Sequence, residues 1–127
     1  MKASELKIGN YINTDAKDEL RTVVEIRHNT VSVKYIRSDT NQPHQSMVEY
    51  DRLTPIPLTE DWLLKSGCEK KSDNIFTIDR FELRWKKAYK YWYVLDAITY
   101  NYFTKIEFVH EWQNFYFVLQ GTELEMK

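Results

Sequence analysis

The chain has 127 residues, of which 43% are hydrophobic, 15% aromatic and 29% charged. This composition is typical of a folded globular protein and excludes a disordered chain, and the length is that of one ordinary domain. Eighteen basic and nineteen acidic residues give a net charge of −1, so no overall field attracts a nucleic acid or a membrane surface.

Cysteine content and hydropathy predict the compartment. Cys68 is the single cysteine, so no intramolecular disulfide can form, unlike in most small secreted domains. No stretch approaches the roughly 20 apolar residues that a membrane-spanning helix needs, and the first residues lack the apolar run of a signal peptide. We therefore expect a cytoplasmic protein without membrane contact.

Residues 1–57 are expected to form a small, barrel-like antiparallel β unit. Apolar and polar residues alternate with a period near two in this part of the chain, and β-branched residues are frequent. Residues 22–27 and 31–37 flank a three-residue polar break, which predicts a β-hairpin. A polar loop over residues 38–46 and a strand over residues 47–53 follow, giving four or five strands.

Two prolines mark the expected boundary between two parts of the chain. Pro55 and Pro57 impose an extended path and lack the N–H group that a strand ladder uses. Residues 58–127 then form the second part, an antiparallel sheet with two short helices, either as an independent domain or with a core that both parts share.

The first of these helices is predicted over residues 60–66. Thr59 stands at the N-cap position, and Glu60 and Asp61 occupy the first turn, where carboxylates favour the positive end of the helix dipole. Gly67 can adopt the left-handed conformation that ends a helix.

Strands and a second helix are predicted over the rest of the chain. The expected strands cover residues 74–78, 81–85, 90–96 and 100–108. From Val109, apolar residues recur at helical spacing up to Leu119, and Gly121 follows where a C-terminal glycine is common. The predicted fold class is therefore α+β and β-rich, with the C-terminal helix packed on the second sheet.

Three stretches carry a resemblance to a known family. They read LKIGNYI (residues 6–12), PIPLTEDWLLKSGCEK (55–70) and KIEFVHEWQNFYFVLQGTELEMK (105–127). In this order and spacing they resemble a family of small uncharacterised proteins of gut anaerobes and their phages and mobile elements. That family has no established activity, so the resemblance implies no functional residues. It implies an origin in phages or mobile elements, whose small accessory products often bind host or viral proteins.

The residues that commonly bind metals or act as nucleophiles are far apart in sequence. They are His28, His44, Cys68 and His110, with no pair at the short spacing of a zinc site. Cys68 follows the first predicted helix, where the negative end of the dipole disfavours a thiolate. Glycine-rich phosphate loops and the G-x-S-x-G motif are absent from the sequence. We therefore predict no catalytic residue, metal or cofactor.

Residues 84–93, RWKKAYKYWY, interleave four basic with five aromatic residues. Such a mixture is typical of single-stranded nucleic-acid sites, where cations contact phosphates and rings stack on bases. The other interpretation is a hairpin whose rings pack within and across the strands and whose lysines form a solvated turn, and the neutral net charge favours it. Under the first interpretation, the contacts come from Arg84, Trp85, Lys86, Lys87, Lys90 and Trp92.

The surplus of aromatic residues indicates an interaction surface. Four Trp, nine Tyr and six Phe residues exceed what a core of this size readily hides. Tyr and Trp are enriched at protein interfaces, so we expect Tyr100, Tyr102 and Phe103 to join the residues named above on such a surface.

The sequence therefore predicts a non-enzymatic protein-interaction or accessory module. Its partner would be a host protein, a phage protein or a second copy of the chain in a homodimer. A single-stranded nucleic-acid-binding module that uses residues 84–93 is the alternative, and an unrecognised hydrolase is a further one.

Overall fold

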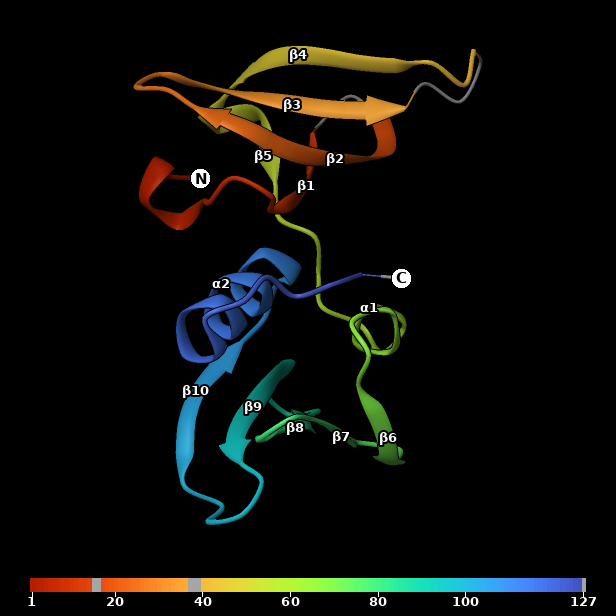
Figure 1. Ribbon diagram of the computed structural model, residues 1–127, viewed down its shortest axis with the longest axis vertical. Coiled ribbons are helices and arrows are strands. Elements are labelled where there is room, and N and C mark those ends of the chain that lie inside the picture. The colour runs from red at the N-terminus through yellow and green to blue at the C-terminus, as the bar shows by residue number, and fades with distance from the viewer. Residues whose placement is uncertain (15–16, 37–39, 127) are drawn as a thin grey trace. The chain divides into compact units, whose positions relative to one another are not determined.

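The computed structural model describes residues 1–14, 17–36 and 40–126 (Figure 1). The described residues form ten strands in two antiparallel sheets together with a C-terminal helix, so the predicted α+β, β-rich fold class is confirmed. Within the same ranges, no helix is long and apolar enough to cross a membrane.

The chain divides into two compact units. The first unit comprises residues 1–56 and 109–114, and the second comprises residues 57–108 and 115–127. Each unit contains one five-stranded sheet.

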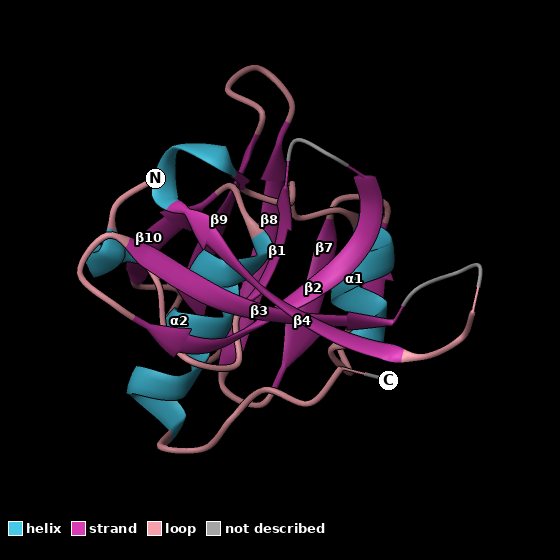
Figure 2. Cartoon of the chain, turned by 90° about the horizontal axis from the view of Figure 1, so that it is seen from above, coloured by secondary structure: helices cyan, strands magenta, loops and turns pink. Residues whose placement is uncertain are grey.

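The sheet of the first unit is a curled half-barrel, in which the bent strand β2 is clearly visible (Figure 2). Its strands follow the order β4-β3-β2-β1-β5. They are β1 (Tyr11–Thr14), β2 (Lys17–Ile26), β3 (Thr30–Ile36), β4 (Pro43–Glu49) and β5 (Leu53–Thr54), and two short 3₁₀ helices accompany them, η1 (Ala3–Glu5) and η2 (Tyr50–Arg52).

The predicted hairpin of the first unit is confirmed as β2 and β3, which pair from Thr22 opposite Lys34 to Ile26 opposite Val31. Val31 and Val33 of β3 point to the same face of the sheet, and both are fully buried, as expected for a sheet with one packed face. The buried cluster that results contains Leu6, Ile12, Val23, Val31, Val33 and Leu53.

The third long strand of the first unit begins earlier than predicted. The sequence predicts a polar loop up to Ser46, but β4 starts at Pro43 and pairs along its whole length with β3. The predicted loop is wrong over residues 43–46 because the backbone ladder, together with the stacked rings of Tyr35 and His44, outweighs the low strand propensity of these polar residues. Residues 37–39 of the predicted strand and loop lie outside the described residues.

The sheet of the second unit follows the order β10-β9-β8-β7-β6. Its strands are β6 (Glu69–Ser72), β7 (Ile75–Ile78), β8 (Phe81–Lys86), β9 (Tyr91–Asp96) and β10 (Tyr102–Ile106). The four predicted strands correspond to β7, β8, β9 and β10. Strand β6 was not predicted, because all four of its residues are exposed and polar and carry no apolar alternation.

Both predicted helices are present, as α1 (Glu60–Lys65) and α2 (Val109–Gln120). Each ends at a glycine with positive φ, +94° at Gly67 and +74° at Gly121, which confirms the predicted left-handed residue after each helix. Thr59 stands at the N-cap of α1 with an extended backbone, although its side chain makes no capping hydrogen bond.

Helix α2 contributes to the cores of both units. Within the first unit, the buried side chain of Gln113 accepts a hydrogen bond from the Tyr11 backbone N–H at 2.8 Å and donates one to the Gly9 carbonyl at 3.1 Å. Within the second unit, the Phe115 ring packs edge-on against Phe81 of β8 at 5.4 Å. The predicted packing of the C-terminal helix on the second sheet is therefore confirmed.

Candidate functional site

Strand alternation divides the predicted basic and aromatic segment between the two faces of the second sheet. Strands β8 and β9 pair in register, with Trp85 opposite Trp92 and Arg84 opposite Tyr93. Since neighbouring side chains of a strand point to opposite faces, the two tryptophans share one face and the cations lie on the other. The outer face therefore carries Arg84, Lys86, Tyr91 and Tyr93, and the helix-covered face carries Trp85 and Trp92.

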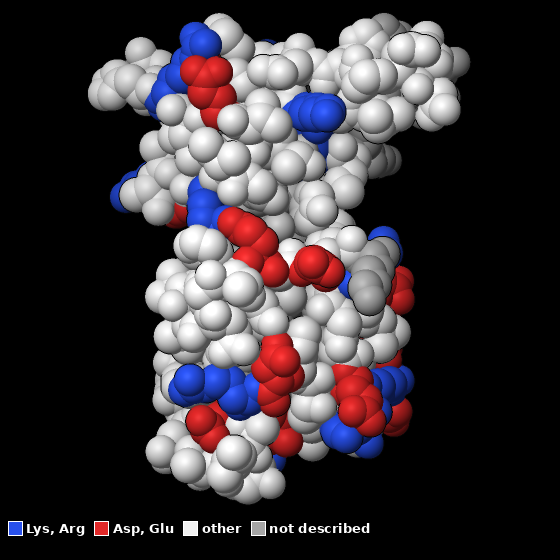
Figure 3. Space-filling model, viewed as in Figure 1, with Lys and Arg blue, Asp and Glu red and all other residues white. Residues whose placement is uncertain are grey.

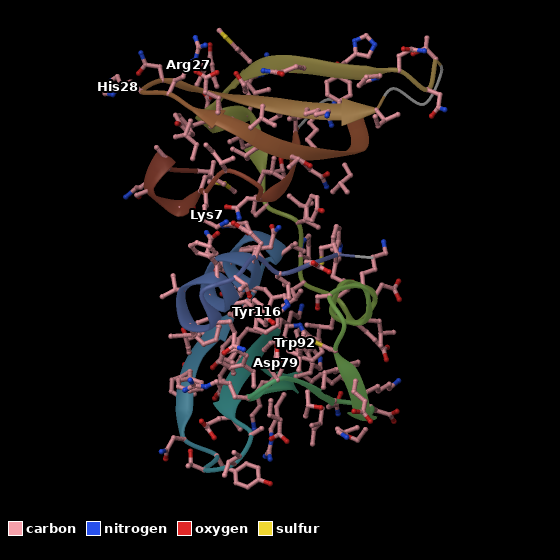
Figure 4. All side chains as sticks on the ribbon, in the orientation of Figure 1. Lys7, Arg27, His28, Asp79, Trp92 and Tyr116 are labelled. Atoms are coloured by element: carbon pink, nitrogen blue, oxygen red, sulfur yellow. The ribbon has the colours of Figure 1, made fainter. Side chains whose placement is uncertain are left out.

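Trp92 belongs to the core of the second unit. Its side chain is 4% exposed, and its ring meets Phe76 edge-on at 5.6 Å. The indole Nε1–H donates a hydrogen bond of 2.9 Å to the carbonyl oxygen of Leu58, just before α1. The label in Figure 4 places Trp92 among side chains within the second unit. The exposed part of the predicted surface therefore does not include this residue.

Four tyrosines form a continuous chain of ring contacts on the outer face, and we call this set (Tyr89, Tyr91, Tyr93 and Tyr102) the tyrosine face. Tyr89 stacks on Tyr91 with ring centroids 5.7 Å apart, and Tyr91 lies 5.0 Å from Tyr93. Tyr93 meets Tyr102 of β10 edge-on at 5.7 Å. The chain of rings therefore runs from the β8–β9 turn across β9 to the edge strand β10.

Two lysine ammonium groups lie over rings of the tyrosine face. The Nζ atom of Lys86 is 5.1 Å from the ring centroid of Tyr93, and that of Lys105 is 5.2 Å from that of Tyr91. Both distances are within the range of cation–π attraction, which holds the lysine side chains along the rings. Lys105 was not predicted as part of the surface. The register of β10 places Lys105 opposite Tyr93, and this pairing is the observation that assigns Lys105 to the outer face.

The arginine of the outer face lies between a carboxylate and a further aromatic ring. Arg84 Nε donates to the carboxylate of Glu82 at 2.7 Å, and its guanidinium carbon lies 5.7 Å from the ring of Tyr100. Tyr100 has a φ of +60° in the β9–β10 turn, where its N–H donates to the Asp96 carbonyl at 2.8 Å. The turn thus presents Tyr100 beside the outer face.

The rims of the outer face expose large apolar area. Tyr89 is 68% exposed, Tyr102 is 58% exposed, and Tyr100 is 59% exposed. In the same turn as Tyr100, Ile98 is 84% exposed. These exposed side chains lie at the two ends of β9, and the rings of Tyr91 and Tyr93 connect Tyr89 with Tyr102.

The remaining residues of the predicted interaction surface lie either in a turn or partly in the core. Lys87 and Lys90 are exposed in the turn between β8 and β9, and Lys90 has a φ of +57°. Phe103 is half-buried and packs against Phe81 and Phe115, with ring centroids 5.9 Å from each. Phe103 therefore contacts the helix-covered side of the sheet.

The hydroxyl groups of the tyrosine face interact directly. Tyr91 donates a hydrogen bond to the hydroxyl of Tyr93 at 3.0 Å. This bond stabilises the protonated phenol and raises the pKa of Tyr91 to about 12, with a smaller contribution from burial. Tyr91 therefore stays neutral at physiological pH.

The residues considered for metal or nucleophilic chemistry lie on separate elements. His28 is in the β2–β3 turn, which Figure 4 shows at one end of the first sheet, His44 is on β4, and His110 is on α2. Cys68 follows α1 in the second unit, and burial raises its pKa to about 11, which suppresses the nucleophilic thiolate. Within residues 1–14, 17–36 and 40–126, no group of three or more His, Cys, Asp or Glu residues is placed to hold a metal ion.

Comparison of the chain with protein-family models, with curated proteins and with solved structures gives no match.

Proposed function

We propose that this chain is a non-enzymatic protein-binding module whose contact surface is the tyrosine face with its flanking cations. The observation that carries the proposal is the chain of four tyrosine rings across β9 and β10, exposed at both ends and bordered by lysines. Tyrosine buries a large area at a small cost in side-chain entropy and keeps a polar hydroxyl group, which suits it to protein interfaces.

The charge of this surface favours an acidic partner segment. Strands β8, β9 and β10 carry Arg84, Lys86 and Lys105 on the outer face, against the single carboxylate of Glu82. Elsewhere the second unit is mixed in sign, and Figure 3 shows acidic and basic side chains close together on the face that it displays. Complementary charge steers association and fixes register, so an acidic segment of a host or phage protein would fit here.

A single-stranded nucleic acid is the second candidate, and the arrangement of the rings supports it less. Base stacking needs free ring faces. In the tyrosine face, Tyr89 and Tyr91 already stack on each other, and ammonium groups lie over Tyr91 and Tyr93. The buried Trp92 is also removed from the set of rings that a base could reach.

A pull-down with matched variants tests the proposal. Tyr102→Ala and Lys105→Glu each change one group of the outer face, and we expect each to abolish the retention of a partner that the wild type retains from cells of the native host. Met47→Ala on β4 and Lys71→Glu on β6 are the controls, because both residues are exposed, Met47 belongs to the first sheet, and β6 is the opposite edge of the second sheet from β10. Equal retention by all four variants would contradict the assignment of this surface.

The nucleic-acid alternative is tested by titrating a short single-stranded oligonucleotide at two salt concentrations. Binding through phosphates would weaken steeply with salt. We expect no saturable binding, and a salt-dependent complex that Tyr91→Ala disrupts would replace the proposed function with the alternative.

A further inference from the structure

A small open depression lies on the helix-covered side of the second sheet, away from the tyrosine face. Its volume is about 290 Å³. It is lined by Leu58, Thr59, Glu60, Asp73, Asn74, Trp85 and Trp92. This volume is at the lower end of the roughly 300–1,000 Å³ that small-molecule sites occupy, so it suits a compact group rather than an extended ligand.

Two tryptophans give the depression a fixed aromatic wall. Trp85 and Trp92 are paired across β8 and β9, with ring centroids 5.1 Å apart and ring planes inclined at 51°. The hydrogen bond from Trp92 to Leu58 locks one indole, and the Trp85 backbone N–H donates to the Asn74 carbonyl at 2.9 Å. The Trp92 indole and the Trp85 backbone are therefore held in place without a ligand, and the accessible aromatic surface comes mainly from Trp85, because Trp92 is 4% exposed.

Every charged side chain in the lining is a carboxylate. Glu60 stands in the first turn of α1, and Asp73 stands in the turn between β6 and β7 with a fully exposed side chain. Indole faces attract cations through the ring quadrupole, and carboxylates at the rim attract cations as well. The same groups repel an anion.

We propose that this depression is a binding site for a small organic cation with a methylated ammonium head. The methyl groups would lie mainly against the Trp85 ring and touch only the small accessible part of Trp92, and the positive charge would face Glu60 and Asp73. This site is independent of the tyrosine face, since it uses the opposite side of the sheet.

The chain's own Lys70 competes for the same carboxylates. Its Nζ atom lies 2.6 Å from Glu60 and 4.0 Å from Asp73, although Lys70 is not in the lining itself. An ammonium without methyl groups prefers these oxygens and water, whereas a methylated head gains from the indoles. Removal of Lys70 is therefore expected to strengthen binding of the organic cation.

The experiment titrates the protein with choline and with 3,3-dimethylbutan-1-ol, the uncharged analogue of the same shape. The readout is the set of tryptophan indole N–H signals in a ¹H–¹⁵N NMR spectrum, assigned by single Trp→Phe variants. We expect choline to shift the signals of Trp85 and Trp92 and to leave those of Trp62 and Trp112 in place. Choline should bind roughly 5- to 30-fold more tightly than the alcohol, as cation–π attraction predicts.

Three variants complete the test. Glu60→Gln should weaken choline binding, Lys70→Gln should strengthen it, and Lys71→Gln should leave it unchanged, because Lys71 pairs with Glu69 instead. The dispersion of each NMR spectrum verifies folding. Absence of shifts at Trp85 and Trp92, or equal affinity for choline and the alcohol, would overturn the proposal.

Discussion

The hydroxyl group of Tyr91 donates a hydrogen bond to that of Tyr93, two positions along the same strand. Because this bond is the largest cause of the raised pKa of Tyr91, Tyr93→Phe should lower that pKa from about 12 toward the ordinary value near 10. The measurement is a pH titration followed by the ¹³Cζ chemical shifts of the tyrosines. Tyr11→Phe in the first unit is the control and should leave the titration of Tyr91 unchanged.

The same bond has a consequence for stability. A phenol whose pKa is higher in the folded state favours folding below its unfolded pKa near 10, and this contribution disappears as the pH rises through about 12. An unchanged pKa of Tyr91 in Tyr93→Phe would show that the two hydroxyls do not interact in solution.

Gln113 should be important for the stability of the first unit. Its side chain is 4% exposed and connects α2 to the backbone of Tyr11 and Gly9. Gln113→Ala would leave a partly buried N–H and a partly buried carbonyl without these hydrogen bonds, at a cost of about 1 kcal/mol or more in the free energy of unfolding. Urea denaturation measures the loss. The exposed Gln45→Ala is the control, and equal stability of the two variants would contradict this role of Gln113.

Cys68 should be inert toward thiol reagents in the folded protein. Its thiol is buried, with a pKa raised to about 11, and its sulfur lies 3.5 Å from the Ser66 hydroxyl. At pH 8 the thiolate fraction is then roughly 100-fold below that of a free cysteine, so labelling by Ellman's reagent should be slower by at least this factor. Labelling in denaturant gives the reference rate. A native rate equal to the denatured rate would rule out the buried placement.

His110 should make the first unit less stable in mild acid. Burial lowers its pKa below the ordinary 6.5, and the carboxylates of Glu111 and Glu5 oppose this effect more weakly. A histidine whose pKa is depressed by folding favours the folded state above its unfolded pKa, and this contribution is lost as the pH falls through the lower folded value. The free energy of unfolding should therefore decrease as the pH drops below about 6.5.

The variant His110→Gln should flatten this pH dependence. The exposed His28→Gln in the β2–β3 turn should keep that of the wild type. Urea denaturation at several pH values between 5 and 8 measures both, and the same slope in His110→Gln and the wild type would exclude His110 as its origin.

Apolar periodicity predicts most of the fold, because it reports which side chains must be buried. The hairpin of β2 and β3, the four apolar strands of the second unit and both helices follow from such patterns or from glycine positions. Strand β6, with the sequence EKKS, and the start of β4 at Pro43 depend instead on pairing with a neighbouring strand. The local sequence of these polar residues contains no pattern that predicts this pairing.

The composition of the sequence predicts which segment contributes to the proposed interaction surface, but it does not predict which face of the sheet each residue occupies. Residues 84–93 were identified by their composition, whereas the division of Trp92 from Tyr91 and Tyr93 requires the strand register. Lys105 joins the surface only through the pairing of β10 with β9. Contacts between residues distant in sequence therefore determine which members of the segment remain accessible.

Site-specific photocrosslinking tests the central claim most directly. A photoreactive phenylalanine analogue replaces Tyr102 in the tyrosine face or, as the control, Met47 on β4, and living host cells are irradiated. The account predicts that position 102 captures a discrete protein through an acidic segment, while position 47 does not capture it. Capture of nucleic acid at position 102, or the same products at both positions, would contradict it.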